Sequence, residues 1–252
     1  MIDDDSTTRA LRPATPAPAI RDDWALFLDL DGTLIDIAPA PDAVVVAPGL
    51  REALAALHRR LSGALAIVSG RSLRDIDALV PLGLAAGAEH GAVLRGPDGQ
   101  LVVAADMPTV PPRWLAALHE FAGLRPGVLV EEKSHAVALH WRLAQEHAEA
   151  AEKLLASLTA EDPRYEVLPA RMAAEIRARG ATKARPVTLL MRQHPFQGRI
   201  PVFVGDDVTD EDGMEAAAAL GGFGLRVPEA FGGSPEEVRA WIARGAAAAA
   251  PQ

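Results

Sequence analysis

Short runs of apolar residues alternate with amphipathic stretches along much of the chain. Apolar runs at residues 24–28, 64–68 and 200–204 have the length of buried strands. Leucines recur at helical spacing between residues 50 and 61, which predicts a helix over 48–61, and a second helix is expected over 72–79. Strands that alternate with helices in this way are typical of a parallel sheet covered by helices, so we predict an α/β fold.

The alternation of strands and helices breaks between about residues 107 and 170. There the pattern reads helix, strand, strand, helix, strand, which predicts an inserted α/β domain rather than a continuation of the parallel sheet. The N-terminus is rich in Asp, Thr and Pro, and we expect it to be a flexible tail. The predicted ranges are 1–20 for the tail, 21–106 and 171–252 for the core, and 107–170 for the inserted domain. A strand expected at residues 173–177 falls in the core on this division.

Two strands of the inserted domain, at residues 128–132 and 136–142, are predicted to form a hairpin with a tight turn near Ser134-His135. A two-residue turn places Lys133 opposite Ala136, Glu131 opposite Ala138 and Leu129 opposite His140. One face of the hairpin is then apolar and packs against helices expected at about 112–122 and 144–158. The other face carries the polar side chains of Glu131, Lys133, His140 and Arg142. That face is either the solvated side of a half-covered sheet or, because two alanines leave a shallow hollow among hydrogen-bonding groups, a surface that suits a sugar.

Two carboxylates follow the first apolar run, in the stretch Leu28-Asp29-Leu30-Asp31-Gly32-Thr33-Leu34. Side chains two residues apart in an extended segment project to the same side, so Asp29 and Asp31 can address one point. Gly32 allows a sharp turn, and Thr33 offers a hydroxyl and an N–H to an oxyanion. Two converging carboxylates repel each other, so a hard cation such as Mg²⁺ is expected between them. The alternative is an acidic pair that caps a helix.

Further polar residues lie at other predicted strand ends and helix starts. The stretch Ser69-Gly70-Arg71 ends the second strand, where a serine can bond a phosphate oxygen and a glycine allows its close approach. Thr182 is a predicted N-cap, which places Lys183 at the positive end of a helix running to about residue 193. Asp206 and Asp207 follow the strand at 200–204, where several acidic groups form a good metal site. Each feature alone is common in loops, but carboxyl ends of parallel strands meet at one sheet edge, and there open α/β folds bind ligands.

Composition limits the classes of partner. The chain of 252 residues has a formal net charge of −9 and no basic stripe, which argues against binding to nucleic acid but not against a small phosphate ester. It has no cysteine, so disulfides and thiolate metal sites are excluded. No apolar run is long enough to span a membrane, and the N-terminus does not read as a secretory signal, so we expect a cytoplasmic protein with no membrane partner. Lysine occurs only at Lys133, Lys153 and Lys183, which suggests sites where a compact ammonium is wanted.

The stretch around Asp29 and Asp31 resembles the first motif of the haloacid dehalogenase-type (HAD) phosphatases, and Ser69, Lys183 and Asp206-Asp207 follow in the order of the other motifs. The resemblance implies a Rossmann-like core with a parallel sheet and an inserted α/β cap domain. It also implies that Asp29 is the nucleophile, that Asp31 is the general acid/base, and that Lys183 assists catalysis. The implied phosphate-binding residues are Thr33, Ser69, Gly70 and Arg71, and the implied Mg²⁺ ligands are Asp29, Asp31, Asp206 and Asp207, with Asp210 orienting metal-bound water beside Asp207.

Within the HAD phosphatases, the chain resembles the trehalose-6-phosphate phosphatases. The resemblance rests on Glu89-His90-Gly91-Ala92, on Val130-Glu131-Glu132-Lys133 with His140-Trp141-Arg142, and on Gly205-Asp206-Asp207-Val208-Thr209-Asp210-Glu211. It implies Mg²⁺-dependent hydrolysis of trehalose 6-phosphate to trehalose and phosphate through an aspartyl-phosphate, as a step of trehalose biosynthesis, with Glu131, Lys133, His140 and Arg142 gripping the disaccharide. One departure is Ala184 after Lys183, where the family usually has Gly.

Three alternatives stay open at this point. The first is a HAD phosphatase for another sugar phosphate, such as sucrose 6-phosphate or mannosyl-3-phosphoglycerate, because only the cap distinguishes these substrates. The second is a phosphomutase, which shares both aspartates. The third is a non-catalytic sugar-phosphate-binding protein, which would require the loss of a catalytic residue, and none is missing.

Overall fold

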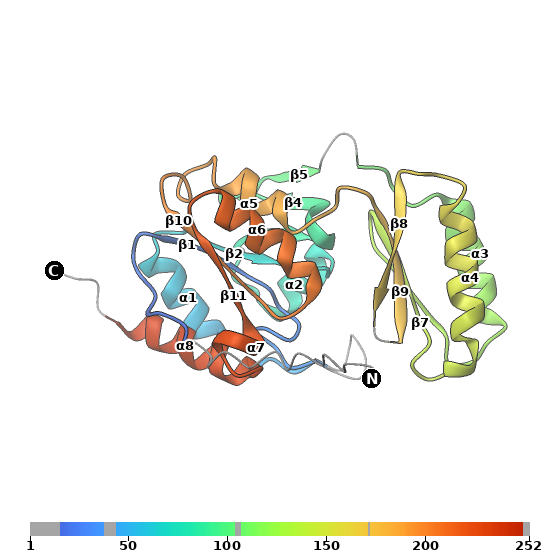
Figure 1. The fold of residues 1–252 in the computed structure, drawn as a ribbon, viewed down its shortest axis with the longest axis horizontal. Coiled ribbons are helices and arrows are strands. Elements are labelled where there is room, and N and C mark those ends of the chain that lie inside the picture. The colour runs from blue at the N-terminus through green and yellow to red at the C-terminus, as the bar shows by residue number, and fades with distance from the viewer. Residues whose placement is uncertain (1–15, 38–43, 104–106, 171, 249–252) are drawn as a thin grey trace, which may run out of the picture.

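The computed structural model describes residues 16–37, 44–103, 107–170 and 172–248. Within them the chain forms two sheets, one of seven strands and one of four strands, and each sheet has its own cluster of buried apolar side chains. The larger sheet and its helices form one body, and the smaller sheet with two helices forms a second body beside it (Figure 1). The α/β fold with a mainly parallel core sheet and an additional α/β cap is therefore confirmed.

The seven-stranded core sheet has the strand order β11-β10-β1-β2-β3-β4-β5. Five neighbouring strands, from β11 to β3, pair in parallel, whereas β4 and β5 continue the sheet in antiparallel pairing. The bounds are β1 (Trp24–Leu28), β2 (Leu65–Val68), β3 (Ala85–Ala88), β4 (Val93–Arg95), β5 (Leu101–Val103), β10 (Ile200–Gly205) and β11 (Phe223–Arg226). Every residue of β1 is buried, which is the reason for its uninterrupted apolar sequence.

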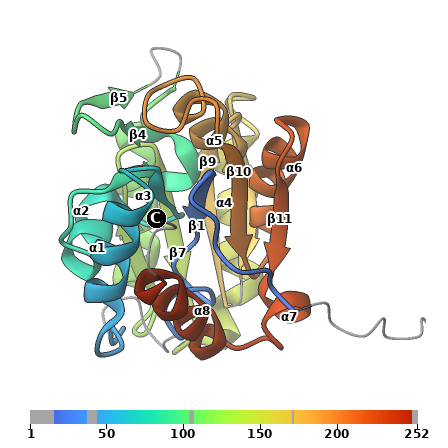
Figure 2. The same ribbon diagram turned by 90° about the vertical axis from the view of Figure 1, so that its left-hand side faces the viewer.

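Helices cover the core sheet, with α1 packed against α8 and α5 packed against α6 (Figure 2). Leu50, Leu54 and Leu57 of α1 are buried, so the helical spacing predicted from the sequence is confirmed. The bounds are α1 (Leu50–Arg60), α2 (Leu73–Leu79), α5 (Ala184–Leu190), α6 (Glu211–Ala219), α7 (Val227–Ala230) and α8 (Pro235–Ala247). Among the helices in the described ranges, none combines the length and the apolar character that a membrane span requires.

The connections of the core sheet run outward in two directions from the neighbouring strands β1 and β10. The chain proceeds from β1 through α1 to β2 on one side, and from β10 through α6 to β11 on the other. Leu28 is paired with Val204, and the Asp29 N–H donates to the Val204 carbonyl at 3.0 Å. Residues that follow these two strands therefore meet in the crevice where doubly wound sheets bind ligands.

The second sheet has the strand order β6-β7-β9-β8 and is antiparallel throughout. Helices α3 and α4 lie on its side away from the core, and its other face is turned toward the core (Figure 1). Trp114 of α3 and Tyr165 of β8 are buried between sheet and helices, with ring centroids 4.9 Å apart. The bounds are α3 (Pro112–Gly123), β6 (Leu129–Glu132), β7 (Ala136–His140), α4 (Ala148–Thr159), β8 (Tyr165–Ala170) and β9 (Ala173–Ala178). We call this body the cap.

The predicted hairpin register is confirmed. Leu129 is paired with His140 and Glu131 with Ala138, and the Lys133 N–H donates to the Ala136 carbonyl at 3.0 Å. The assignment of the strand at 173–177 to the core was wrong, because β9 pairs with β7 on one side and β8 on the other. The cap sheet therefore extends beyond the predicted boundary at residue 170.

Two further local expectations differ from the structure. Lys183, not Thr182, is the N-cap of α5, and no side chain caps this helix. Residues 18–20, predicted to belong to a flexible tail, are docked on the core: Ile20 is 5% exposed, and the Trp241 indole N–H donates to the Pro18 carbonyl at 2.7 Å. An isoleucine that covers α8 stabilises this segment by removing apolar surface from water. Residues 1–15 of the predicted tail lie outside the described residues.

Candidate active site

A cavity of about 460 Å³ opens between the core and the cap. This volume lies in the range of about 300–1,000 Å³ that is typical of small-molecule sites. Residues of both the core and the cap line it. The predicted site residues among its lining are Asp29, Asp31, Ser69, Gly70, Arg71, Glu131, Lys133, His140, Arg142, Lys183 and Asp207. Residues more than 100 positions apart in the sequence, from two separately packed bodies, therefore surround one space.

Lys183 lies at the bottom of the core side, between two buried carboxylates. Its ammonium donates to Asp29 Oδ1 at 2.8 Å and to Asp210 Oδ1 at 2.7 Å. Burial alone lowers the pKa of Lys183, but the two carboxylates outweigh burial and raise it above its usual value. Lys183 is therefore a permanent cation that holds Asp29 in place, facing the cavity.

A third carboxylate, that of Asp206, lies beside the two that Lys183 contacts. Oxygen atoms of Asp29, Asp206 and Asp210 lie within 4.8 Å of one another. Burial raises the pKa of Asp29 well above its usual value, and the nearby carboxylates of Asp210 and Asp206 raise it further against the opposing effect of Lys183. Burial, with Asp207 and Asp210, raises the pKa of Asp206 to about 6. An all-oxygen donor set with excess negative charge fits a hard divalent cation such as Mg²⁺.

Asp210 has a larger part in this cluster than the sequence predicted. It is fully buried, and its Oδ2 accepts hydrogen bonds from the N–H groups of Asp206 and Asp207 at 3.0 and 3.1 Å. This fixes the backbone after β10 and aims Asp206 at Asp29. The Asp207 side chain is instead occupied by Thr209, whose N–H and hydroxyl both donate to Asp207 Oδ1. The structure thus brings Asp210, rather than Asp207, into the three-carboxylate cluster.

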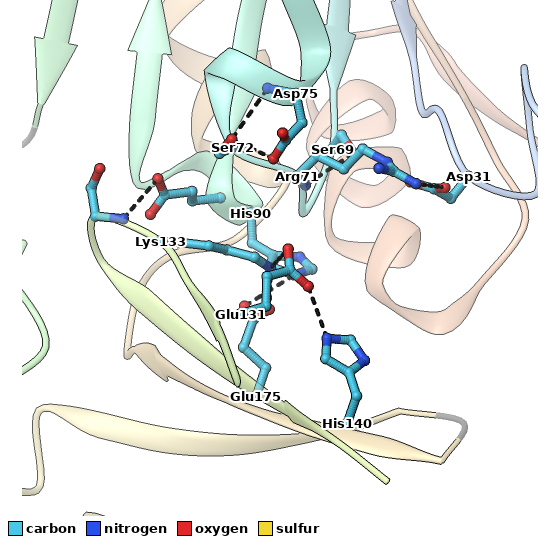
Figure 3. A network of polar contacts seen from close by, with 12 residues as sticks. Asp31, Ser69, Arg71, Ser72, Asp75, His90, Glu131, Lys133, His140 and Glu175 are labelled. Carbon is cyan, nitrogen blue, oxygen red and sulfur yellow. Dashed lines mark hydrogen bonds and ion pairs between the residues drawn. The ribbon is translucent and has the colours of Figure 1, made fainter. Parts of the chain in front are cut away.

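Asp31 lies closer to solvent than Asp29. Its two carboxylate oxygens accept hydrogen bonds from Nε and Nη2 of Arg71, each at 2.6 Å (Figure 3). A two-point contact of this kind fixes both planar groups. The predicted phosphate-binding residue Arg71 therefore orients the predicted general acid/base Asp31 across the cavity floor.

Ser69 and Gly70 lie where a phosphate-binding turn was predicted. Ser69 is 1% exposed, and its hydroxyl oxygen accepts from the Arg71 N–H at 3.2 Å. A Cβ at Gly70 would lie 2.5 Å from His90 Nε2, so only glycine fits beside this ring. Thr33 is fully buried and does not line the cavity, because its hydroxyl donates to Asp206 Oδ1 at 3.4 Å and its N–H is used in the local turn. The structure places Thr33 behind a candidate metal ligand.

The cap side of the cavity carries the polar face predicted for the hairpin. His140 Nε2 and Glu131 Oε2 lie 2.8 Å apart, and this hydrogen bond, against the effect of burial, lowers the pKa of Glu131. Lys133 is almost fully buried and donates to Glu175 of β9 (Figure 3). Burial lowers the pKa of Lys133, but Glu175 and Glu131 outweigh that effect and raise it. Arg142 also lines the cavity at its cap side.

Sequence reasoning missed Glu175 as a site residue and gave His90 no role beyond a motif. Glu175 lies opposite Ala138 on the polar face of the cap sheet, with its Oε1 3.5 Å from His90 Nε2. The sequence did contain a signal, because polar Glu175 and Arg177 alternate with apolar Ala174 and Ile176. This alternation indicates the polar face of the cap sheet only after the strand has been assigned to the cap. Burial, together with three neighbouring cations, lowers the pKa of His90 well below its usual value, so its ring is neutral.

Comparison with known proteins identifies the family. The trehalose-phosphatase family model matches residues 27–231, more than half of the chain. The chain is 40% identical over 235 residues to a probable trehalose-phosphate phosphatase of Sinorhizobium fredii, covering 88% of this chain and 87% of that protein. It is 36% identical over 217 residues to the trehalose-6-phosphate phosphatase of Escherichia coli, covering 85% and 81%.

Solved structures agree in fold. The C-terminal domain of the Candida albicans trehalose-6-phosphate phosphatase superposes with a TM-score of 0.71 at 20% identity, covering 92% of this chain and 98% of that domain. The residues matched by the family model run from β1 to β11 and include the whole cap. The chain belongs to the trehalose-phosphatase family.

Proposed function

We propose that this protein hydrolyses trehalose 6-phosphate to trehalose and inorganic phosphate in a reaction that requires Mg²⁺. One observation carries the proposal: a single cavity joins Asp29, Asp31 and Lys183 of the core to the polar face of the cap hairpin. The core residues suit a phosphoryl group, and the cap residues suit the hydroxyl groups of a sugar. The relatives' names, which include trehalose-6-phosphate phosphatase, support this choice of substrate.

In the proposed reaction, Asp29 attacks the phosphorus atom in line with the sugar oxygen, and the P–O bond to the sugar breaks as the aspartyl-phosphate forms. Asp31 gives its proton to the departing sugar oxygen. It then accepts a proton from the water that attacks the aspartyl-phosphate, which releases phosphate and regenerates the Asp29 carboxylate. In the structure both Asp31 oxygens accept from Arg71, so the proton-donating form of Asp31 requires one of these two contacts to be released, while the other keeps Asp31 in position.

In this proposal, the remaining core residues stabilise the charges of the phosphoryl group and of the metal ion. Lys183 fixes the Asp29 carboxylate and, with Ser69, faces the phosphoryl oxygens. Asp29 and Asp206 would hold Mg²⁺, with Asp31 and Asp207 as the further ligands predicted from the sequence. The bound ion supplies positive charge that offsets the repulsion between the attacking carboxylate and the phosphate. Asp210 keeps the segment that carries Asp206 in place.

The cap residues determine the substrate in this proposal. Glu131, paired with His140, and Lys133, paired with Glu175, present charged hydrogen-bonding groups to the sugar hydroxyls. Arg142 extends the same side of the cavity. The cap also excludes bulk water from the reacting groups. A cytoplasmic location and the absence of a nucleic-acid partner stay predictions from the sequence.

Phosphate release from a panel of sugar phosphates, with and without Mg²⁺, tests this function. We expect trehalose 6-phosphate to be hydrolysed far faster than sucrose 6-phosphate, mannosyl-3-phosphoglycerate or p-nitrophenyl phosphate, and EDTA to abolish hydrolysis. Equal rates across the panel would refute the substrate and leave the reaction class standing. Asp29→Asn should be inactive, and persistent hydrolysis by this variant would refute the nucleophile.

A second measurement tests the role of the cap. Glu131→Ala should lower the kcat/KM for trehalose 6-phosphate much more than that for p-nitrophenyl phosphate, because the small aryl ester has no sugar for the cap to bind. Glu132→Ala is the matched control, since Glu132 lies on the same hairpin but pairs with His119 away from the cavity. A larger loss with the small ester than with the disaccharide would refute the proposed role of the cap face.

A further inference from the structure

Glu89 belongs to the core but its carboxylate binds the cap. It lies in the short turn Glu89–Gly91 after β3 and is only 3% exposed. Its Oε1 accepts from the Ser134 N–H at 3.1 Å, and its Oε2 accepts from the His135 N–H at 2.7 Å. One buried carboxylate thus satisfies two backbone donors of the turn between β6 and β7. Hydrogen bonds to a charged acceptor are about twice as strong as neutral ones.

The backbone around Glu89 is tied to the phosphate-binding turn of the core. The Glu89 N–H donates to the Arg71 carbonyl at 2.9 Å, and the His90 N–H donates to the Ser69 carbonyl at 3.1 Å. Glu89 and His90 both have left-handed backbone conformations, with φ of 50° and 55°. Residues other than glycine keep this conformation only where their surroundings enforce it. The enforced conformation lets the backbone of this turn face Ser69 and Arg71 while the Glu89 side chain reaches the cap.

The turn that Glu89 binds also sets the position of the cap's polar side chains. Ser134 directly follows Lys133, and the Lys133 N–H closes the turn on the Ala136 carbonyl. Lys133, held in this way, pairs with Glu175, whose carboxylate lies 3.5 Å from the His90 ring (Figure 3). On the other side of the turn, the His135 ring lies 3.2 Å from the Pro108 carbonyl in the segment that enters the cap. The turn is therefore held both by the core and by the connection between the two bodies.

We propose that Glu89 is a positioning residue that fixes the sugar-binding face of the cap relative to the phosphate-binding turn of the core. It does so through the backbone of Ser134 and His135, without lining the cavity itself. The consequence for catalysis rests on the proposed function, whereas the contact between core and cap does not. With Glu89 in place, Ser69 and Lys133 keep the separation that one sugar phosphate requires.

Hydrogen exchange of the two bound amides tests the contact directly. Glu89→Gln keeps one acceptor oxygen but turns an amide N–H group toward a backbone N–H and removes the charge. We expect the Ser134 and His135 amides, read by NMR, to exchange about tenfold faster in this variant than in the wild type. Glu132→Gln makes the same change on the same hairpin at a half-exposed side chain, and it should leave both amides unchanged. Unchanged exchange in Glu89→Gln would overturn the proposal.

Kinetics then separate positioning from a general loss of structure. Glu89→Gln should lower kcat/KM for trehalose 6-phosphate about tenfold more than kcat/KM for p-nitrophenyl phosphate, mainly through KM, because the core groups are intact while the cap face is displaced. An equal loss with both substrates, or no loss with either, would overturn positioning. If the wild type does not hydrolyse trehalose 6-phosphate, the proposed function is wrong, and the exchange rates still decide whether Glu89 holds the turn.

Discussion

Lys183→Met is the most direct test of the electrostatic arrangement in the core. Methionine has a similar length but no charge, so the substitution removes one cation and keeps most of the packing. Lys183 is 4% exposed, and both of its carboxylate partners, Asp29 and Asp210, are buried. The variant therefore leaves two buried carboxylates without their charged donor, at distances that were 2.8 and 2.7 Å.

The size of the effect follows from the proton that the variant must take up. An aspartate has a usual pKa of 3.8, so adding a proton to one buried carboxylate at pH 7.5 costs about 5 kcal/mol, at about 1.36 kcal/mol per pH unit. Leaving the carboxylate charged and unpaired costs a similar amount, about 3–5 kcal/mol. We therefore expect metal-free Lys183→Met to lose about 3–5 kcal/mol of the free energy of unfolding at pH 7.5.

The loss should depend on pH in a defined direction. In the variant, the folded protein holds a proton on Asp29 or Asp210 that the unfolded chain lacks above pH 3.8, so stability rises as the pH falls. Lowering the pH from 7.5 to 5.5 should reduce the loss to about 2 kcal/mol by the same relation. Urea denaturation in EDTA, followed at both pH values by circular dichroism, measures this. The wild type keeps Lys183 charged at both pH values, and the loss is the difference between wild type and variant at each pH.

Lys153→Met is the matched control for this experiment. Lys153 pairs with Glu149 at 2.6 Å, but the two side chains are 74% and 82% exposed, so the change should be below about 0.5 kcal/mol. A loss below about 1 kcal/mol in Lys183→Met at pH 7.5, or an equal loss at both pH values, would refute the view that Lys183 neutralises buried carboxylates.

Three further outcomes follow from the site and the cap. Gly70→Ala should lower trehalose 6-phosphate turnover by at least about tenfold, measured by phosphate release, because its Cβ would lie 2.5 Å from the His90 ring; wild-type kinetics would contradict this. In EDTA, Asp206 should cost the wild type about 0.5–1 kcal/mol as the pH rises from 5 to 7, since its pKa of about 6 means that the folded state holds the extra proton at the lower pH; the slope in urea denaturation should be shallower in Asp206→Asn, where Asp29 and Asp210 still contribute, and an unchanged slope would contradict this. Trp114→Ala should cost about 3–5 kcal/mol in thermal or urea unfolding, because the ring is fully buried against Tyr165, and a loss below about 1 kcal/mol would contradict the packing described for the cap.

Strands that are buried on both faces, or in which apolar and polar residues strictly alternate, were predictable from the sequence. The strand at 24–28 was predicted with its observed bounds, since the strand lies in the middle of the sheet and every position must be apolar. The hairpin register was predicted because a shift of one residue would bury Glu131 and expose Val130 and Leu139. The approach of Asp206 to Asp29 was predicted because both follow parallel strands, and parallel strand ends share one edge.

Pairings between distant segments could not be read from local pattern. The sequence of β9 is Ala-Ala-Glu-Ile-Arg-Ala, and this local pattern does not indicate which of the two sheets the strand joins. Placing it in the core removed Glu175 from consideration, although this residue pairs with Lys133. The contact of Arg71 with Asp31 spans 40 positions and fixes an orientation that spacing does not encode. The positions of the functional side chains were thus predictable, whereas their partners depended on tertiary contacts.

A count of formal charge on the core side supports the proposal that the reaction requires a divalent cation. The acidic groups there outnumber the basic ones: Asp29, Asp31, Asp206, Asp207 and Asp210 against Lys183 and Arg71. Five negative and two positive charges leave a formal excess of three negative charges, which repels a phosphate monoester dianion. A divalent ion held by Asp29 and Asp206 would reduce this excess to one and would supply positive charge where the repulsion of the phosphate is strongest. The formal charges of the cap side are balanced, with Glu131 and Glu175 against Lys133 and the cavity-lining Arg142. Removal of the metal should therefore abolish turnover of every phosphate ester, large or small, because the repulsion arises in the core, whereas changes on the cap should affect the disaccharide most.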